Sequence, residues 1–170
     1  STNRLNKILK IDIENLQAIV EPGVINQELK NELSPLGLNY PPDPASMGSS
    51  TIGGNIAHGS GGPKAVKYGV TRDYVLNLEV VLPTGEVIWT GANTLKNSTA
   101  FSITHLMIGS EGLLGVITKA VLKLVPLKTE ELLMLAAFSN PESAAKCVNK
   151  ILLNGFIPAG IELMEKAGVD

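Results

Sequence analysis

The sequence predicts an α+β fold, because segments with the two-residue period of strands alternate with segments that have the period of amphipathic helices. Hairpin patterns occupy 10–21 and 75–90, and a helix pattern occupies 25–34. A long stretch rich in Gly and Pro, from Tyr40 to Tyr68, has neither period. With 170 residues, the chain is long enough for one domain and part of another.

The first elements are a hairpin and a helix. Residues 10–21 alternate apolar and polar side chains on either side of a polar turn at Glu14, and Pro22 ends the second arm. Apolar side chains then recur every four residues within 25–34, and Pro35 stops the pattern. This spacing predicts an amphipathic helix with one face in the core.

The stretch from Tyr40 to Tyr68 is predicted to be an irregular loop. Its glycines and prolines are separated by Ser, Thr and Asn and follow no helix or strand period. Connections longer than about 12 to 15 residues are uncommon in compact domains unless they have a function. The length of the stretch therefore predicts a ligand-binding loop.

Regular structure resumes after this loop. Residues 75–90 predict the second hairpin, with its turn at 83–86. Residues 99–108 predict a short helix, and 116–125 predict a long strand that Pro126 closes. We place a domain boundary after this proline.

Residues 127–170 are predicted to begin a second domain. An apolar run at 132–138 predicts a buried strand, and Pro141 opens a helix pattern that Gly155 ends. An extended segment at 159–164 follows. This strand–helix–strand opening indicates part of a ferredoxin-like domain.

Composition argues against several classes of protein. The chain has 16 acidic and 14 basic residues and no two adjacent Lys or Arg residues, which argues against nucleic-acid binding. Its longest apolar run is far shorter than the roughly 18 residues of a membrane span. A single cysteine excludes an internal disulfide and a cysteine-rich metal site, and it suits a reducing compartment.

Residues 48–55 have the chemistry of a cradle for an anion or a polar ring, because glycines let backbone N–H groups approach a ligand closely. We expect the closest approach at Gly53-Gly54. The segment nearly matches a triphosphate-binding loop, but Gly54-Asn55 stands where Lys and Ser or Thr are required. No G-x-G-x-x-G follows a strand and opens a helix, so a Rossmann dinucleotide site is excluded. The alternative is a group of glycine turns that binds nothing.

Residues 109–115 place Glu111 among three glycines just before a predicted strand. Its carboxylate is a candidate acceptor for a ribose hydroxyl or for backbone N–H groups of its own turn. The alternative is a helix end closed by glycine. Tyr68, at the far end of the long loop, either lines a flat ring or anchors the loop.

No cluster of catalytic side chains is evident. His58 and His105 have no second His or acidic residue at metal-ligand spacing, and Cys147 lies in a helix pattern among small apolar residues. We therefore assign no catalytic residue and no metal ligand to this chain.

Five motifs carry a resemblance to known proteins: Pro42-Asp43-Pro44, Thr51 to Ala57, Gly61-Gly62, Lys67 to Asp73, and Ile108 to Thr118. In this order and spacing they resemble the FAD-linked 2-hydroxyacid dehydrogenases, of the glycolate oxidase large subunit and D-lactate dehydrogenase type. These belong to the vanillyl-alcohol-oxidase (PCMH-type) flavoprotein superfamily.

The resemblance implies that residues 1–126 are the C-terminal part of a PCMH-type FAD-binding domain, its second subdomain, and that 127–170 begin a ferredoxin-like substrate (cap) domain. It implies FAD held without a covalent bond, with 44–62 around the pyrophosphate and isoalloxazine and 111–117 at the adenosine end. The residues implied to bind FAD are Pro44, Ser49, Ser50, Thr51, Gly53, Gly54, Asn55, Gly61, Gly62, Tyr68, Gly69, Glu111, Gly112, Gly115, Val116 and Ile117.

The implied activity is oxidation of a small D-2-hydroxy acid, such as glycolate or D-lactate, to the 2-oxo acid by hydride transfer to flavin. Electrons would pass to a quinone, another protein or oxygen. The expected location is the cytoplasm, with contact to the membrane through the electron acceptor, and the expected partners are other subunits or further copies of the chain. The 170 residues are expected to be a fragment that is inactive alone.

Two alternatives stay open: a flavin-fold interaction subunit without catalysis, and an oxidase of the same superfamily that acts on another alcohol. The glycines favour a flavin-binding chain over the interaction subunit, because a chain without flavin would not need all of them. They are Gly53, Gly54, Gly61, Gly62, Gly112 and Gly115.

Overall fold

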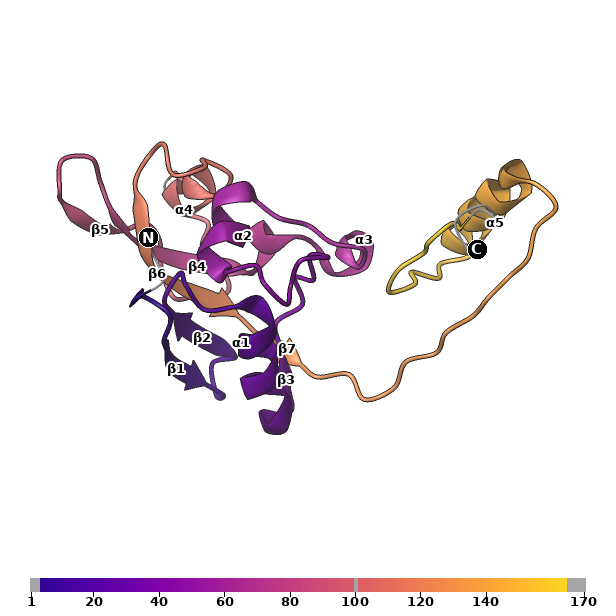
Figure 1. Cartoon of the computed structure of the whole chain (residues 1–170), viewed down its shortest axis with the longest axis horizontal. Helices are drawn as coiled ribbons and strands as arrows, with labels where there is room; N and C mark the ends of the chain where they lie inside the picture. The colour runs from indigo at the N-terminus through magenta and orange to yellow at the C-terminus, as the bar shows by residue number, and fades with distance from the viewer. Residues whose placement is uncertain (1–3, 100, 165–170) are drawn as a thin grey trace.

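The computed structural model of this chain describes residues 4–99 and 101–164 (Figure 1). A body formed by the residues up to 126 is followed by an extended segment and a smaller C-terminal unit (Figure 1). The elements of the body are β1 (Ile8–Asp12), β2 (Gln17–Val20), α1 (Asn26–Leu33), β3 (Leu38–Asn39), α2 (Ile52–His58), α3 (Ala65–Tyr68), β4 (Val75–Val81), β5 (Val87–Trp89), α4 (Ile103–Met107), β6 (Val116–Lys123) and β7 (Val125–Pro126). The C-terminal unit contains α5 (Pro141–Leu153).

The main sheet consists of two hairpins joined by β6. Its strand order is β1-β2-β6-β4-β5, and every neighbouring pair is antiparallel. β6 pairs with β4 from Val116 to Leu122 and with β2 over its last residues, where Ala18 lies opposite Leu122. Both hairpins predicted from the sequence are confirmed. The last strand of the sheet in sequence is its central strand.

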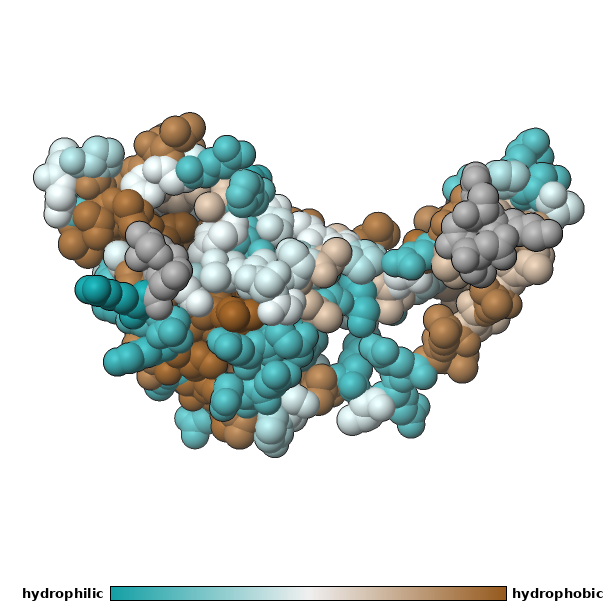
Figure 2. Space-filling view, viewed as in Figure 1, coloured by the Kyte–Doolittle hydropathy of each residue, from teal (hydrophilic) through white to brown (hydrophobic). Residues whose placement is uncertain are grey.

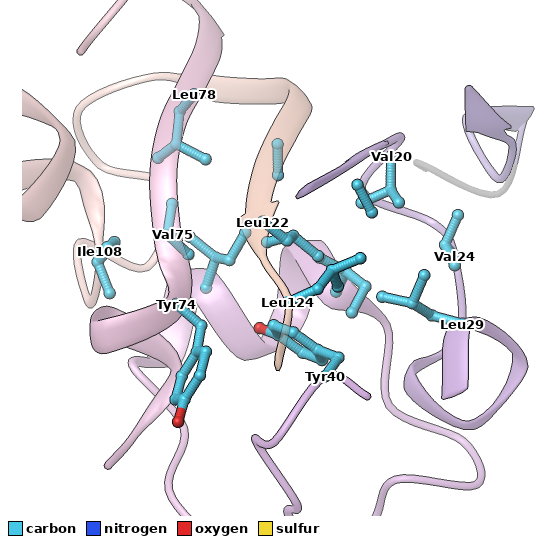
Figure 3. Packing of buried hydrophobic residues seen from close by; sticks show 14 of the residues in the cluster. Val20, Val24, Leu29, Tyr40, Tyr74, Val75, Leu78, Ile108, Leu122 and Leu124 are labelled. Carbon is cyan, nitrogen blue, oxygen red and sulfur yellow. The ribbon is translucent and has the colours of Figure 1, made fainter. Parts of the chain in front are cut away.

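The hydrophobic core joins this sheet to α1 and α2 (Figure 3). Leu29 and Leu33 of α1 are fully buried, which confirms that the four-residue spacing marks the inner face of this helix. The fully buried side chains around them include Val20, Ile52, Ile56, Leu78, Leu122 and Leu124. The mixed helix and sheet content confirms the α+β class.

The stretch from Tyr40 to Tyr68 is more regular than expected, because it contains α2 and α3. The prediction of an entirely irregular loop is therefore wrong. Glycine disfavours helix by about 1 kcal/mol relative to alanine, so propensity alone does not indicate α2. Tertiary contacts determine it instead: the Thr51 hydroxyl accepts a hydrogen bond from the Gly54 N–H at 3.1 Å, and the Gly53 N–H donates to the Pro22 carbonyl at 2.8 Å.

The helix predicted at 99–108 is shorter than expected. α4 begins at Ile103, and Ser102 caps it by accepting a hydrogen bond from the His105 N–H. Serine is a strong helix cap, so the helix begins after Ser102 and not at residue 99 as predicted. Ala100, which falls within the predicted helix, lies outside the described residues.

The apolar run at 132–138 is not a strand. The side chains from Leu132 to Leu135 are at least 83% exposed, and the residues of the run pair with no strand in the described part of the chain. The prediction of a buried strand is wrong here because an isolated extended segment has neither a ladder partner nor a core to cover it.

α5 forms as its sequence predicts. Asn140 caps it by accepting a hydrogen bond from the Ser143 N–H at 2.8 Å, and Pro141 occupies the first helical position. The segment at 159–164 forms no strand, and residues 165–170 lie outside the described ranges. Of the predicted strand–helix–strand opening, only the helix is present. The boundary after Pro126 and the ferredoxin-like assignment stay predictions.

Candidate functional site

Backbone hydrogen bonds bring the two glycine-rich segments together at the last turn of α2. The Gly109 N–H donates to the carbonyl of Ile56 at 3.0 Å, and the Glu111 N–H donates to the carbonyl of Ala57 at 3.0 Å. The two segments are far apart in the sequence and show separate patterns there. In the structure they form one site.

A cavity of about 290 Å³ lies between these segments. Of the residues predicted to bind the cofactor, those in its wall are Thr51, Gly53, Gly54, Gly112, Gly115, Val116 and Ile117. The remaining wall residues are Pro22, Ala57, Met107 and Ser110. Ala57 and Ser110 lie within the motifs noted in the sequence, whereas Pro22 and Met107 do not. Ligand pockets usually measure about 300–1,000 Å³, so this cavity matches one portion of a dinucleotide rather than all of it.

The glycines of the site have two different structural roles. A Cβ atom at Gly53 would lie 2.5 Å from Pro22 Cβ, and one at Gly115 would lie 2.6 Å from Val80 Cγ1. A Cβ at Gly62 would overlap the carbonyl of Asp43. These three glycines are needed for packing within the protein, so the number of glycines is not by itself evidence for flavin.

Gly54 and Gly112 have more room. A Cβ at Gly54 would meet only Thr51 Oγ1, at 3.1 Å, and a Cβ at Gly112 would meet nothing within 4 Å. Gly112 also has φ +79°, which favours glycine. Both residues line the cavity, so their missing side chains leave space for a ligand.

The backbone N–H groups at the start of α2 are already hydrogen-bonded within the protein. The Ile52 N–H donates to the Val24 carbonyl at 2.8 Å, and those of Gly53 and Gly54 donate to Pro22 and Thr51 as described above. The expectation that the N–H groups of Gly53-Gly54 approach a ligand is therefore not supported. This turn therefore offers a ligand a surface without side chains at Gly53 and Gly54 and without free N–H donors at these positions.

Buried polar atoms on either side of this turn have unused hydrogen-bonding capacity. Ser50 Oγ and Asn55 Nδ2 have no hydrogen-bond partner among the described residues, and Asn55 is only 2% exposed. An unsatisfied buried polar group costs about 1–3 kcal/mol, so such atoms favour a polar partner. Ser50 and Asn55 flank the glycine turn in the sequence but lie outside the cavity wall, so the feature that fits FAD is the glycine-lined space itself, which has room for part of a flat ring system.

Glu111 lies between the cavity residues Ser110 and Gly112 and adopts φ +52°. Its carboxylate is 69% exposed, and Oε1 lies 4.0 Å from His58 Nδ1. An exposed pair of this kind contributes little to stability. No N–H group in the described part of the chain donates to this carboxylate, which leaves it available to a ligand hydroxyl.

The other residues predicted to bind FAD lie outside the cavity wall: Pro44, Ser49, Ser50, Asn55, Gly61, Gly62, Tyr68, Gly69 and Glu111. Tyr68 has its ring near two ammonium groups, with Lys67 Nζ at 5.8 Å and Lys128 Nζ at 5.1 Å from the ring centroid. Its carbonyl accepts a hydrogen bond from the Tyr74 hydroxyl. These contacts match the alternative in which Tyr68 anchors the loop. Its contact with FAD stays a prediction.

A larger groove of about 710 Å³ lies between β1 and α1, away from the glycine motifs. Its wall includes Lys10, Glu28 and Glu32. Two carboxylates against one ammonium group make it a poor place for the anionic pyrophosphate of FAD. The smaller cavity is the better candidate.

His105 and Cys147, two of the residues that sequence reasoning set aside, are not part of the cavity wall. His105 Nδ1 is 2.6 Å from the hydroxyl of Ser102 at the start of α4, and Cys147 is half-buried in α5. The described residues contain no group of three His, Cys, Asp or Glu side chains that could hold a metal ion. Within the same ranges, no helix has the length and apolar character needed to cross a membrane.

Comparison with known proteins identifies the family. A family model described as an FAD binding domain matches residues 1–91. The chain is 48% identical over 162 residues to glycolate oxidase subunit GlcD of Bacillus subtilis (strain 168), which covers 95% of this chain and 34% of that protein. It is 42% identical over 166 residues to a D-lactate dehydrogenase of Anaerostipes hadrus, covering 98% of this chain and 35% of that protein.

A solved structure of alkyldihydroxyacetonephosphate synthase has a similar fold, with a TM-score of 0.77 and 30% identity over 93% of this chain and 28% of the other. The chain spans about a third of the length of the curated relatives it matches. The family model covers more than half of the chain and includes the first glycine segment. The chain therefore belongs to the FAD binding domain family, and its cofactor is FAD.

Proposed function

We propose that the protein oxidises a small D-2-hydroxy acid, such as glycolate or D-lactate, to the corresponding 2-oxo acid. The observation that carries the proposal is the cavity shared by the two glycine-rich segments, in a chain 48% and 42% identical to proteins named for glycolate and D-lactate. The similarity to alkyldihydroxyacetonephosphate synthase is weaker, at 30% identity. It therefore supports oxidation of another alcohol less strongly than the two relatives above support oxidation of a 2-hydroxy acid.

FAD, when bound, supplies the acceptor for the hydride that leaves the hydroxyl-bearing carbon of the substrate. The residues of this chain bind and orient the cofactor. Gly54 and Gly112 leave the space, and the exposed carboxylate of Glu111, between the wall residues Ser110 and Gly112, is available to a hydroxyl of the cofactor. Buried Met107 provides an apolar part of the wall, which excludes water from one side.

The proposal includes the remaining partners. Oxidation of the substrate requires an electron acceptor, which is a quinone, another protein or oxygen. One relative is named as a subunit, which supports assembly with other chains. A cytoplasmic location is proposed on the single cysteine of the sequence, which suits a reducing compartment. Contact with the membrane is proposed through the electron acceptor alone.

A chimaera tests the function. The matching segment of the Anaerostipes hadrus D-lactate dehydrogenase is replaced by residues 1–170 of this chain, which align over 98% of their length. The unaltered host enzyme is the control. We expect the chimaera to purify with FAD and to reduce an artificial dye with D-lactate or glycolate, but not with L-lactate.

Each outcome separates the alternatives. A folded chimaera that holds FAD but oxidises neither acid contradicts the proposed activity and favours an interaction subunit. A folded chimaera without FAD contradicts the assignment of the cavity. Turnover restricted to another alcohol, such as an alditol, favours an oxidase of the same superfamily with a different substrate.

A further inference from the structure

We propose that residues 63–68, here called the α3 segment, form a docking surface for the C-terminal unit of the same chain, and that polar contacts make this docking reversible and sensitive to salt. The proposal does not depend on the enzymatic activity. It concerns how residues 128–160 are held beside the body.

Contacts between the two parts converge on the α3 segment. The ammonium group of Lys67 donates a hydrogen bond to the carbonyl of Ile157 at 2.6 Å. The ammonium group of Lys64 lies 3.4 Å from the carboxylate of Glu131. Glu131 belongs to the extended segment and Ile157 to the C-terminal unit, so the two lysines contact the residues after 126 at two places that lie far apart in the sequence. In Figure 1, α3 is the helix of the body that faces this unit.

Tyr68 provides a third contact. Lys128 belongs to the extended segment and places its ammonium group 5.1 Å from the centroid of the Tyr68 ring. Lys67 lies 5.8 Å from the same centroid. Both distances are within the range of a cation–π interaction. The tyrosine ring is thus a contact for the segment that leads to the C-terminal unit.

The α3 segment is itself anchored to the body by charge. Lys64 Nζ lies 4.0 Å from Asp43, and Asp43 accepts a hydrogen bond from Lys30 of α1 at 3.2 Å. The Lys30 and Asp43 side chains are only 17% and 16% exposed. Lys64 therefore lies between the half-buried carboxylate of Asp43 in the body and the carboxylate of Glu131 in the extended segment, whose side chain is 80% exposed.

The docking contacts bury little apolar surface. Val66 on α3 is 87% exposed, and the apolar side chains from Leu132 to Leu135 are also exposed. Figure 2 shows the larger brown apolar areas on the body, and a mostly pale and teal, more polar surface toward the C-terminal unit. Each exposed ion pair shifts an equilibrium by no more than about fivefold. An interface of this kind opens when charges are screened.

Distances between two spin labels test the proposal in the 170-residue chain. Ser98→Cys in the body and Asn149→Cys on α5 provide exposed labelling sites, in a Cys147→Ser background that removes the single natural cysteine. Electron–electron double resonance then reports the distribution of distances between them. At about 0.01 M salt, where the Debye length is about 30 Å, we expect a narrow distribution. At about 1 M salt, where it is about 3 Å, we expect a broad one.

Matched lysine substitutions locate the surface. The double variant Lys64→Ala/Lys67→Ala is expected to broaden the distribution at low salt and to lower the docked-to-open ratio by about two- to fivefold for each contact removed. The control Lys146→Ala/Lys150→Ala removes the same charge from α5. It is expected to keep the narrow distribution. Lys128→Ala, in the extended segment, is the second test variant. It replaces the double variant if the double variant lowers the midpoint temperature of unfolding.

Two results would overturn the proposal. A broad distribution in the unsubstituted chain at low salt would show that the C-terminal unit does not dock. A narrow distribution that survives high salt and both test variants would show that other residues hold it.

Discussion

Gly53 and Gly54 are neighbours in α2 that face different surroundings. A Cβ at Gly53 would collide with Pro22, whereas a Cβ at Gly54 would meet only the hydroxyl of Thr51 at the edge of the cavity. The first glycine permits α2 to pack closely, and the second leaves space beside it. Substitutions at the two positions should therefore change different properties, namely stability and ligand affinity.

Gly54→Val in the D-lactate dehydrogenase chimaera is expected to lower FAD affinity by roughly tenfold or more, because a misfit of about 1.4 kcal/mol already has that effect. The branched side chain would occupy space in the cavity wall. Flavin content and a fluorescence titration measure the change. Ala145→Val, at an exposed position of α5, is the control for an added branched side chain. A fully flavin-loaded Gly54→Val protein would exclude this turn from the site.

Glu111→Ala is expected to weaken FAD binding by about 1.5 to 3 kcal/mol, the contribution of a hydrogen bond to a charged group. The exposed carboxylate at the edge of the cavity is the proposed acceptor for a ribose hydroxyl. The same titration measures the affinity. Glu14→Ala, at the turn between β1 and β2, is a control for the loss of one negative charge. Unchanged affinity in Glu111→Ala would leave Glu111 with a role in its turn alone.

For single residues, the sequence indicated the glycine motifs but not which glycine is needed for packing and which leaves space in the cavity. Thr51, Gly54 and Gly112 were found because glycine-rich segments outside regular structure are typical of ligand sites. Pro22 and Met107 were missed because one looks like a strand stop and the other like a core residue of a helix. The hydrogen bond from the Gly53 N–H to the Pro22 carbonyl places Pro22 in the wall, and the bonds that join α2 to the second glycine segment bring the region after Met107 to the same place.

Among the elements, β6 contributes Val116 and Ile117 to the cavity wall and pairs with β4. Gly115, one residue before β6, packs against Val80 and the backbone of Val81 in β4. Gly115→Ala is expected to destabilise the protein by about 1–3 kcal/mol through overpacking. Urea unfolding measures this change, and Gly48→Ala, which has open space, is expected to stay near the value of the unsubstituted protein. Equal midpoints for the two variants would contradict the packing role of Gly115.

The same pair of strands makes stability depend on pH. Partial burial raises the pKa of Glu79 on β4, but hydrogen bonds from Lys119 at 3.0 Å and Thr118 at 2.8 Å lower it more, so its net pKa is below the ordinary 4.5. A carboxyl group with a depressed folded-state pKa stabilises the protein above the unfolded-state pKa. That contribution is lost as the pH falls through the folded-state pKa.

Glu79→Gln is therefore expected to lower stability at neutral pH and to reduce the further loss of stability below about pH 4.5. Urea midpoints measured from neutral pH down into the acid range provide the comparison. Glu86→Gln, in the exposed turn of the β4–β5 hairpin, is the matched control. Parallel curves for Glu79→Gln and the unsubstituted protein would show that the Glu79–Lys119 contact does not contribute.

The elements with a clear period, both hairpins, α1 and α5, could be predicted because local pattern and tertiary packing agree in them. α2 could not, since two adjacent glycines disfavour a helix and contacts to Pro22 and Val24 are needed to hold it. In the run at 132–138, a strand was predicted that does not form. Its composition is that of a buried strand, but no strand in the described part of the chain lies beside it.

For the whole molecule, the core belongs to the body alone. Among residues 4–99 and 101–164, the core cluster and the half-buried side chains packed against it extend no further along the sequence than Val125. Removal of residues 127–170 is expected to change the free energy of unfolding of the body by less than about 0.5 kcal/mol, as for surface changes. Urea unfolding of residues 1–126 beside the 170-residue chain measures the difference. A much larger loss would contradict the boundary after Pro126.

The central place of β6 also determines when the body can fold during synthesis. The β1–β2 and β4–β5 hairpins are each local in sequence, but they share no strand pairing until β6 lies between them. Pairings between distant segments are slow to form, because the entropy of closing the loop is lost before the contacts are gained. β6 ends at Lys123, so a nascent chain in which this residue is still inside the ribosome cannot join its two hairpins into one sheet. The cavity for the flavin forms only after that point, because its wall joins residues from both sides of this last step.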